Sequence, residues 1–239
     1  MIKIKKKKTL IALTLALITS VVFLPRCYDA NHATVRIKLT NLPVSYNAPK
    51  EHIIDRVLNI FSKKAYAETG YHGNMLYVAA FEGDAPLAVI CVNPPKGAME
   101  TSVELRVPAG TARKIVALVE REYSSTNQIF ITEYGESDPV NLVAGEEHPV
   151  SFQMKSMSTA LDVKQAELGL PRREWNKITG ASSYSIYKDQ GSSAPDYEFL
   201  VNTTNTHYVP SSGSGNYGLE VNFSFIGKKS SDKVSFYFP

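Results

Sequence analysis

The side chains able to bind a metal or to act as acids, bases and nucleophiles are scattered along this chain. No pair of its histidines has metal-ligand spacing with another donor, so a bound transition metal is not expected. The five are His32, His52, His72, His148 and His207. A Gly-x-Ser-x-Gly elbow, a phosphate-binding loop and a dinucleotide fingerprint are also absent from the sequence. We therefore expect no catalytic residue, no cofactor and no metal, and the sequence favours a non-catalytic protein.

Acidic residues gather at two predicted turns. Glu133, Glu136 and Asp138 flank one turn, and Glu146 and Glu147 lie in the other. Neither group has the alternating spacing of oxygen ligands that a dedicated calcium loop requires. We expect these carboxylates to be solvated turn charges.

Cysteine is the remaining reactive side chain, and the sequence has only Cys27 and Cys91. At most one disulfide can form. Cys91 lies in the uncharged apolar segment 87–92, which predicts a buried thiol acting as a small hydrophobic residue.

The N-terminus has the organisation of a secretory signal. A basic run, Lys3 and Lys5–Lys8, precedes the uncharged apolar stretch Thr9–Leu24. At 16 residues this stretch is shorter than the roughly 20 residues of a spanning helix. A signal peptide over residues 1–26 is favoured, an uncleaved anchor stays open, and the chain is expected to be exported.

Removing this segment changes the charge balance. Six of the 26 basic residues and none of the 23 acidic residues lie in 1–26, which leaves 20 basic against 23 acidic residues and a net charge of −3. The apparent basicity belongs to the signal, so no nucleic-acid partner is expected.

The segment Leu24–Cys27 ends the apolar stretch with a cysteine three residues after a leucine. It resembles the lipobox of bacterial lipoproteins, with Arg26 where that family prefers a small residue. The resemblance implies that Cys27 is lipidated and that the chain is a membrane-anchored lipoprotein, periplasmic or at the cell surface. Ordinary cleavage nearby, after Ala30 or Ala33, is the alternative.

Short alternating segments follow. In Ala33–Leu42, Val35, Ile37 and Leu39 share one face, which predicts a half-buried strand, and similar segments recur with turns between them up to residue 155. Residues 50–67 instead repeat at helical spacing. We expect a β-sandwich domain over 33–155 with an inserted amphipathic helix near 50–67, packed on the sheet or lying on a membrane.

Several turn residues in this domain share a pattern with known proteins. They are Val107-Pro-Ala-Gly110, Arg113, Gly135, Val140-Asn-Leu142 and Ala144-Gly-Glu146. The pattern resembles a β-sandwich repeat of exported bacterial lipoproteins. The resemblance implies fold and location and carries no activity.

The segment 159–239 contains the only tryptophan, Trp175, followed by Tyr184, Tyr208, Tyr217 and the turn at 227–230. This order resembles a fibronectin type III domain. The resemblance implies that Trp175 packs between two sheets and that Tyr217 makes a corner contact, and the strand pattern adds Tyr184 to this core. No Arg-Gly-Asp is present, so integrin recognition is unsupported.

Alternation in the strand after Trp175 places Ser183, Ser185 and Tyr187 on the outward face. Tyr187 and Tyr197 are therefore the possible binding face of this domain. Exposed rings of this kind stack on sugars, although in an alternating strand about half of the aromatics face the core.

Together these patterns predict an all-β protein of two tandem antiparallel β-sandwich (immunoglobulin-like) domains. The short polar connection 156–159 predicts domains stacked end to end as a rod. The favoured function is a non-catalytic exported lipoprotein that acts as an interaction, adhesion or spacer module, with a protein or glycan partner. A carbohydrate-binding accessory protein is the alternative, and a hydrolase with a site at the domain junction is less favoured.

Overall fold

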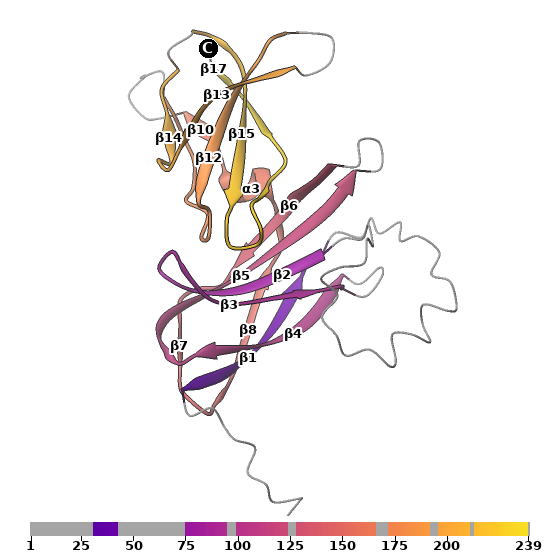
Figure 1. The fold of residues 1–239 in the computed structure, drawn as a ribbon, viewed down its shortest axis with the longest axis vertical. Coiled ribbons are helices and arrows are strands. Elements are labelled where there is room, and N and C mark those ends of the chain that lie inside the picture. The colour runs from indigo at the N-terminus through magenta and orange to yellow at the C-terminus, as the bar shows by residue number, and fades with distance from the viewer. Residues whose placement is uncertain are drawn as a thin grey trace, which may run out of the picture.

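The computed structural model describes residues 31–42, 75–94, 99–123, 128–165, 172–191, 196–210 and 213–238. Most of these residues are in strands, with one short helix among them (Figure 1), which confirms the predicted all-β class. No helix within these ranges is long and apolar enough to cross a membrane. The signal peptide, Cys27 and the helix expected at 50–67 lie outside the described residues.

The first unit, described residues 31–156, begins with the three-stranded sheet A. Its central strand β1 (His32–Thr40) pairs with β4 (Glu100–Pro108) on one side and β8 (Glu147–Gln153) on the other. Val35, Ile37 and Leu39 are fully buried, as their alternation predicts. The β1–β8 pair is parallel, whereas the sequence favoured antiparallel strands. These strands lie at opposite ends of the unit's sequence, so no hairpin fixes their direction.

Sheet B is the larger sheet of the first unit. It runs in the order β3 (Ala85–Val92), β2 (Met75–Glu82), β5 (Gly110–Tyr123), β6 (Gln128–Glu136) and β9 (Lys155–Ser156), with β7 (Val140–Leu142) beside β5.

Strand β5, in the interior of sheet B, is buried on both faces. All five side chains of the β5 segment 115–119 are at most 1% exposed. Ile115, Ala117 and Val119 belong to the core shared with sheet A, whereas Val116 and Leu118 belong to a second core that contains residues of the C-terminal half. Burial on both faces explains why this strand reads as an unbroken apolar run rather than an alternating one.

Cys91 is exposed, so the expectation of a buried thiol was wrong. It lies on β3, which is paired with β2 on one side only and forms an edge of sheet B. Alternate residues of this strand, including Val89, face solvent. An apolar segment of this length does not reveal by itself whether the strand is central or at an edge.

The second unit, described residues 157–238, begins with the helix α3 (Met157–Leu161). Ser156 caps it by accepting a hydrogen bond from the Thr159 amide at 3.2 Å, and Met157 and Leu161 are buried. Two sheets follow. Sheet C has the order β10 (Lys164–Gln165), β11 (Arg173–Glu174), β14 (His207–Tyr208), and sheet D has β13 (Tyr197–Thr203), β12 (Ser183–Asp189), β15 (Gly215–Phe223), β16 (Lys229–Ser230), with β17 (Val234–Phe238) beside β15.

Aromatic side chains fill the core of the second unit. Trp175, just after β11, lies 5.4 Å from the Tyr184 ring of β12, measured between centroids, and both are buried. Tyr217 is fully buried against Phe238 at 4.9 Å, and its hydroxyl donates a hydrogen bond to the Gly213 carbonyl at 3.0 Å. The hydrogen bond satisfies the one polar group that this ring carries into the core.

Two valine substitutions test whether the second core, between sheet B and the second unit, stabilises the fold. Val116→Ala removes two methyl groups from the face that meets the second unit, and we expect the free energy of unfolding in urea to fall by about 2 kcal/mol. The control Val89→Ala lies on the edge strand at 43% exposure and should stay within about 0.5 kcal/mol of the wild type. Equal effects at the two positions would contradict the second core.

Candidate functional site

The junction between the units is a continuous apolar contact between the face of sheet B and the second unit. One hydrophobic cluster joins Phe81, Val116 and Leu118 of sheet B to the side chains of α3, Trp175 and sheet D. Phe81 meets Phe225 edge to face at 5.1 Å. Gly180, at φ +84°, permits this approach, because a Cβ there would lie 2.7 Å from the Phe81 ring. The units thus meet across one face of sheet B and follow one another along the long axis of the molecule (Figure 1).

A hydrogen-bonded network centred on Glu136 closes one part of the junction. Its Oε2 accepts hydrogen bonds from the Tyr134 hydroxyl at 2.7 Å and from Thr179 Oγ1 at 2.6 Å, with Lys114 Nζ at 3.2 Å. The Thr179 amide in turn donates to the Tyr134 hydroxyl at 3.1 Å. Because Thr179 belongs to the second unit and the other three to the first, the network fixes one unit against the other.

A second polar contact lies near β16. Lys229 Nζ is 2.6 Å from Glu120 Oε2, which also accepts a hydrogen bond from the Tyr77 hydroxyl at 2.9 Å. Beside it, Ile131 of β6 forms a parallel bridge with Ser231, and the Asp232 amide donates to the Ile131 carbonyl at 3.1 Å. Backbone pairing between the units leaves little freedom for them to rotate.

These environments shift the pKa values of the network in opposite directions. Burial alone would raise the pKa of Glu136, but the hydrogen bonds from Thr179, Tyr134 and Lys114 together lower it below its ordinary value. Burial, reinforced by the Glu136 carboxylate, raises the pKa of Tyr134, and burial with Glu120 does the same for Tyr77. At neutral pH the Glu136 carboxylate is therefore an ionised acceptor facing the neutral phenol of Tyr134.

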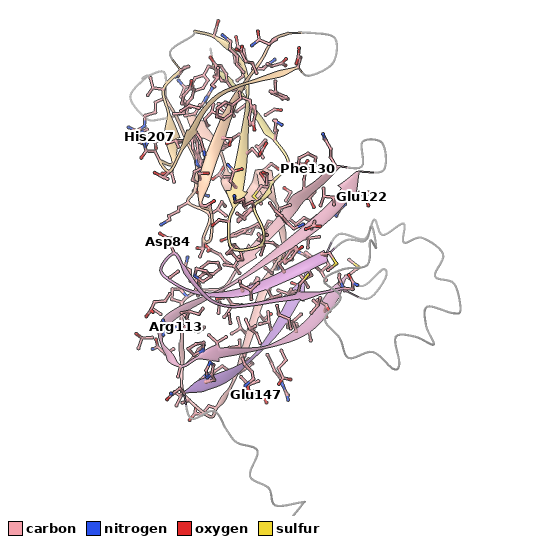
Figure 2. All side chains as sticks on the ribbon, viewed as in Figure 1. Asp84, Arg113, Glu122, Phe130, Glu147 and His207 are labelled. Carbon is pink, nitrogen blue, oxygen red and sulfur yellow. The ribbon has the colours of Figure 1, made fainter. Side chains whose placement is uncertain are left out.

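A cleft of about 450 Å³ opens beside this network. Asp84, at the tip of the β2–β3 turn, lies on the side of the first unit that faces the second (Figure 2), and its carboxylate is 2.7 Å from Lys177 Nζ. The rest of the lining comes mostly from segment 180–184, from Thr204 and from Ser224 and Phe225. We call this space the junction cleft. It is where the sequence placed the less favoured hydrolase site.

The residues predicted as a binding face lie together on the outer surface of sheet D. The Tyr197 hydroxyl and Ser235 Oγ are 2.9 Å apart. The Tyr197 ring therefore lies across Gly218, which has no side chain to block it. Lys233 Nζ lies 4.4 Å from the centroid of the Tyr187 ring. Both predicted tyrosines are thus half-buried, and each contacts a side chain that comes before or within β17 of the same sheet.

Two neighbouring positions change the composition of this face. Phe199 pairs with Tyr187 in the sheet and is 55% exposed, and Tyr237 is 54% exposed. Ser185, which the alternation placed outward and free, is buried and accepts a hydrogen bond from Asn222 at 2.8 Å. The side chains available to a partner are therefore Phe199 and Tyr237, which the sequence analysis did not single out as binding residues.

Part of the motif of the first unit forms a structural turn at the start of β5. Arg113 is buried and donates a hydrogen bond to the Ala109 carbonyl at 3.2 Å, and Asn141 of β7 accepts one from the Ala112 amide at 3.0 Å. Arg113 also lies 2.5 Å from Glu82 across sheet B. This part of the pattern therefore holds β5 and β7 together.

Within the described ranges, no three histidine, cysteine or acidic side chains lie close enough to hold a metal ion. His148 accepts a hydrogen bond from the Val143 amide at 3.0 Å, so it has a local structural role. No family model, curated protein or solved structure matches this chain.

The pKa of Glu136 predicts acid sensitivity of the junction. Because its folded pKa lies below the unfolded value of about 4.3, its contribution is complete above that pH and is lost as the pH falls through the folded value. Glu136→Gln should lower the free energy of unfolding by about 1–2 kcal/mol at neutral pH, and the difference from the wild type should shrink below about pH 4.

Urea unfolding of both proteins between neutral pH and about pH 3 measures this difference. Asp138→Asn removes an exposed carboxylate two residues away and should change the stability by less than about 0.5 kcal/mol. A Glu136→Gln difference that is constant with pH would exclude a stabilising ionised carboxylate.

Proposed function

We propose that this chain is a non-catalytic, exported and membrane-anchored lipoprotein that acts as a rigid interaction or spacer module. The observation that carries the proposal is the junction, where an apolar core, a backbone bridge and two carboxylate-centred contacts join the units. A protein that positions a binding surface at a distance from a membrane gains from such a fixed connection, whereas a hinged cleft would need a freer one.

The location and the finer fold rest on sequence. The basic run, the apolar stretch and Cys27 support export and lipid anchoring, and the order of Trp175, Tyr184 and Tyr217 supports an immunoglobulin-like second domain of the fibronectin type III kind. Packed sheets in the first unit are compatible with a β-sandwich over 33–155. The proposed partner, a protein or a glycan, would meet the exposed rings of Phe199 and Tyr237.

A second candidate is a carbohydrate-binding accessory protein. The junction cleft favours it, because hydroxyl side chains and the half-buried ring of Phe225 line one concave site of about 450 Å³. In this role the fixed junction would hold the two walls of the cleft at a constant separation.

Distances between spin labels test the rigid connection. Labels on Val143→Cys and Val209→Cys, exposed positions in the first and second units, are placed in the full chain carrying Cys27→Ala and Cys91→Ser. We expect a single narrow distance distribution by pulsed electron paramagnetic resonance. The control pair, Met99→Cys with Val143→Cys, lies within the first unit and sets the width of a rigid pair. A distribution between the units that is several times broader would overturn the spacer proposal.

Acyl labelling tests the anchor. In bacterial cells fed a labelled fatty acid, the wild type should be labelled in a globomycin-sensitive manner, while Cys27→Ala should be unlabelled and released from the membrane fraction. Cys91→Ala is the matched control and should be labelled like the wild type. Equal labelling of the wild type and Cys27→Ala would remove the lipoprotein assignment.

A further inference from the structure

The junction cleft has walls from both units, and several of its lining groups take no part in holding the units together. The β2–β3 hairpin contributes Phe81 and Asp84, and the second unit contributes turns and strand ends around segment 180–184, Thr204 and Ser224. Its volume of about 450 Å³ falls in the range of small-molecule sites in proteins.

Hydroxyl groups are the main polar lining. Ser182 donates a hydrogen bond to the Asn222 carbonyl, and Ser183 accepts one from the Asn222 side chain. Thr204 and Ser224 are exposed and make no hydrogen bond within the described ranges of the chain. Each hydroxyl can both donate and accept, so these two residues offer paired hydrogen bonding to a ligand.

The charge of the cleft is balanced. Asp84 and Lys177 pair at 2.7 Å, and both side chains are 63% exposed. A phosphate or carboxylate ligand would meet a lysine that already has an anionic partner, and a cation would meet a carboxylate that already has its counter-charge. The site therefore favours a ligand without net charge.

The half-buried ring of Phe225 supplies the accessible aromatic part of the lining. It meets Phe81 edge to face at 5.1 Å, whereas Phe81 and Tyr184 are buried, at 0% and 3% exposed. Sugars combine many hydroxyls with apolar C–H surfaces, so they match hydroxyls set around an aromatic ring. A peptide strand added to a sheet would instead need an open strand edge, whereas this lining comes mostly from turns and strand ends.

We infer that the junction cleft is a binding site for a neutral saccharide, held by Thr204, Ser224 and the Asp84–Lys177 pair against the ring of Phe225. The inference rests on the second of the two proposed functions and gives it a location that differs from the predicted face at Tyr187 and Tyr197.

The chain contains its own reporter of this site. Trp175 is the only tryptophan and lies 5.4 Å from Tyr184, which lines the cleft. Titration with glucose, N-acetylglucosamine, cellobiose and chitobiose, followed by tryptophan fluorescence, should give a saturable change with at least one sugar. We expect a Kd of about 1 mM or tighter, equivalent to roughly 4 kcal/mol of binding free energy.

Two double variants test whether the change in tryptophan fluorescence comes from a sugar bound in the cleft. Thr204→Val with Ser224→Ala removes the two hydroxyls and should weaken binding at least about tenfold, because a polar sugar group then loses its partner. Thr111→Val with Ser151→Ala makes the same chemical changes at exposed positions outside the cleft and should bind like the wild type. Urea unfolding midpoints equal to that of the wild type confirm that the fold of both variants is unchanged. Equal binding by both variants would overturn the cleft assignment.

Retention on insoluble cellulose and chitin distinguishes the assignment of the cleft from the proposed carbohydrate-binding function. If the wild type and the cleft variant are retained equally, the carbohydrate function stands and the cleft is not its site. If no sugar changes the fluorescence and neither polysaccharide retains the protein, both the cleft assignment and the carbohydrate function are overturned.

Discussion

The packing of the second unit on the outer face of sheet B is the interaction on which the rest of the structure depends. Strand β5 contributes alternate side chains to two cores, with Ala117 and Val119 facing sheet A and Val116 and Leu118 facing the second unit. A sheet shared in this way couples the two units, because displacing β5 disturbs both cores at once. It also leaves the first unit with an apolar face that only a neighbouring layer can satisfy.

Polar contacts determine which arrangement this packing adopts. Apolar side chains by themselves tolerate small shifts, but Glu136 and Glu120 must each meet a particular donor from the second unit, Thr179 and Lys229 respectively. A partly buried carboxylate that loses its partners is costly, so misaligned dockings are disfavoured. The backbone bridge between Ile131 and Ser231 also fixes the position of the second unit along β6.

Local alternation predicted the strands well, because the two faces of a half-buried strand differ in chemistry. Val35, Ile37 and Leu39 of β1 show this. The apolar segments 115–119 and 87–92 are the counterexample. Both are rich in Val, Ile, Leu and Ala, yet the first is central and buried on both sides, while the second is an edge on which Cys91 is exposed. Neighbouring strands decide this difference, and they are not encoded locally.

The helix α3 at the connection and the site escaped prediction for related reasons. Ser156–Thr159 is polar, but Ser156 caps α3, and the helix turns Met157 and Leu161 into the core. The junction cleft draws its lining from positions as far apart as Phe81 and Phe225. Tyr187 and Tyr197 were placed near the outer surface of sheet D, but contacts with Lys233 and Ser235, distant in sequence, engage their side chains. Side-chain availability, unlike strand identity, depends on such long-range neighbours.

The shared face of sheet B also has a consequence for how the protein is made. Chains are synthesised from the N-terminus, and units tend to fold in that order, so the first unit can pair its strands before the second exists. During that interval Phe81, Val116, Leu118 and Ile131 form an uncovered apolar surface, because their cover is built from residues 157–238. Contiguous apolar surface of this kind invites association with other chains. The C-terminal unit thus provides the cover that this face of the N-terminal unit requires.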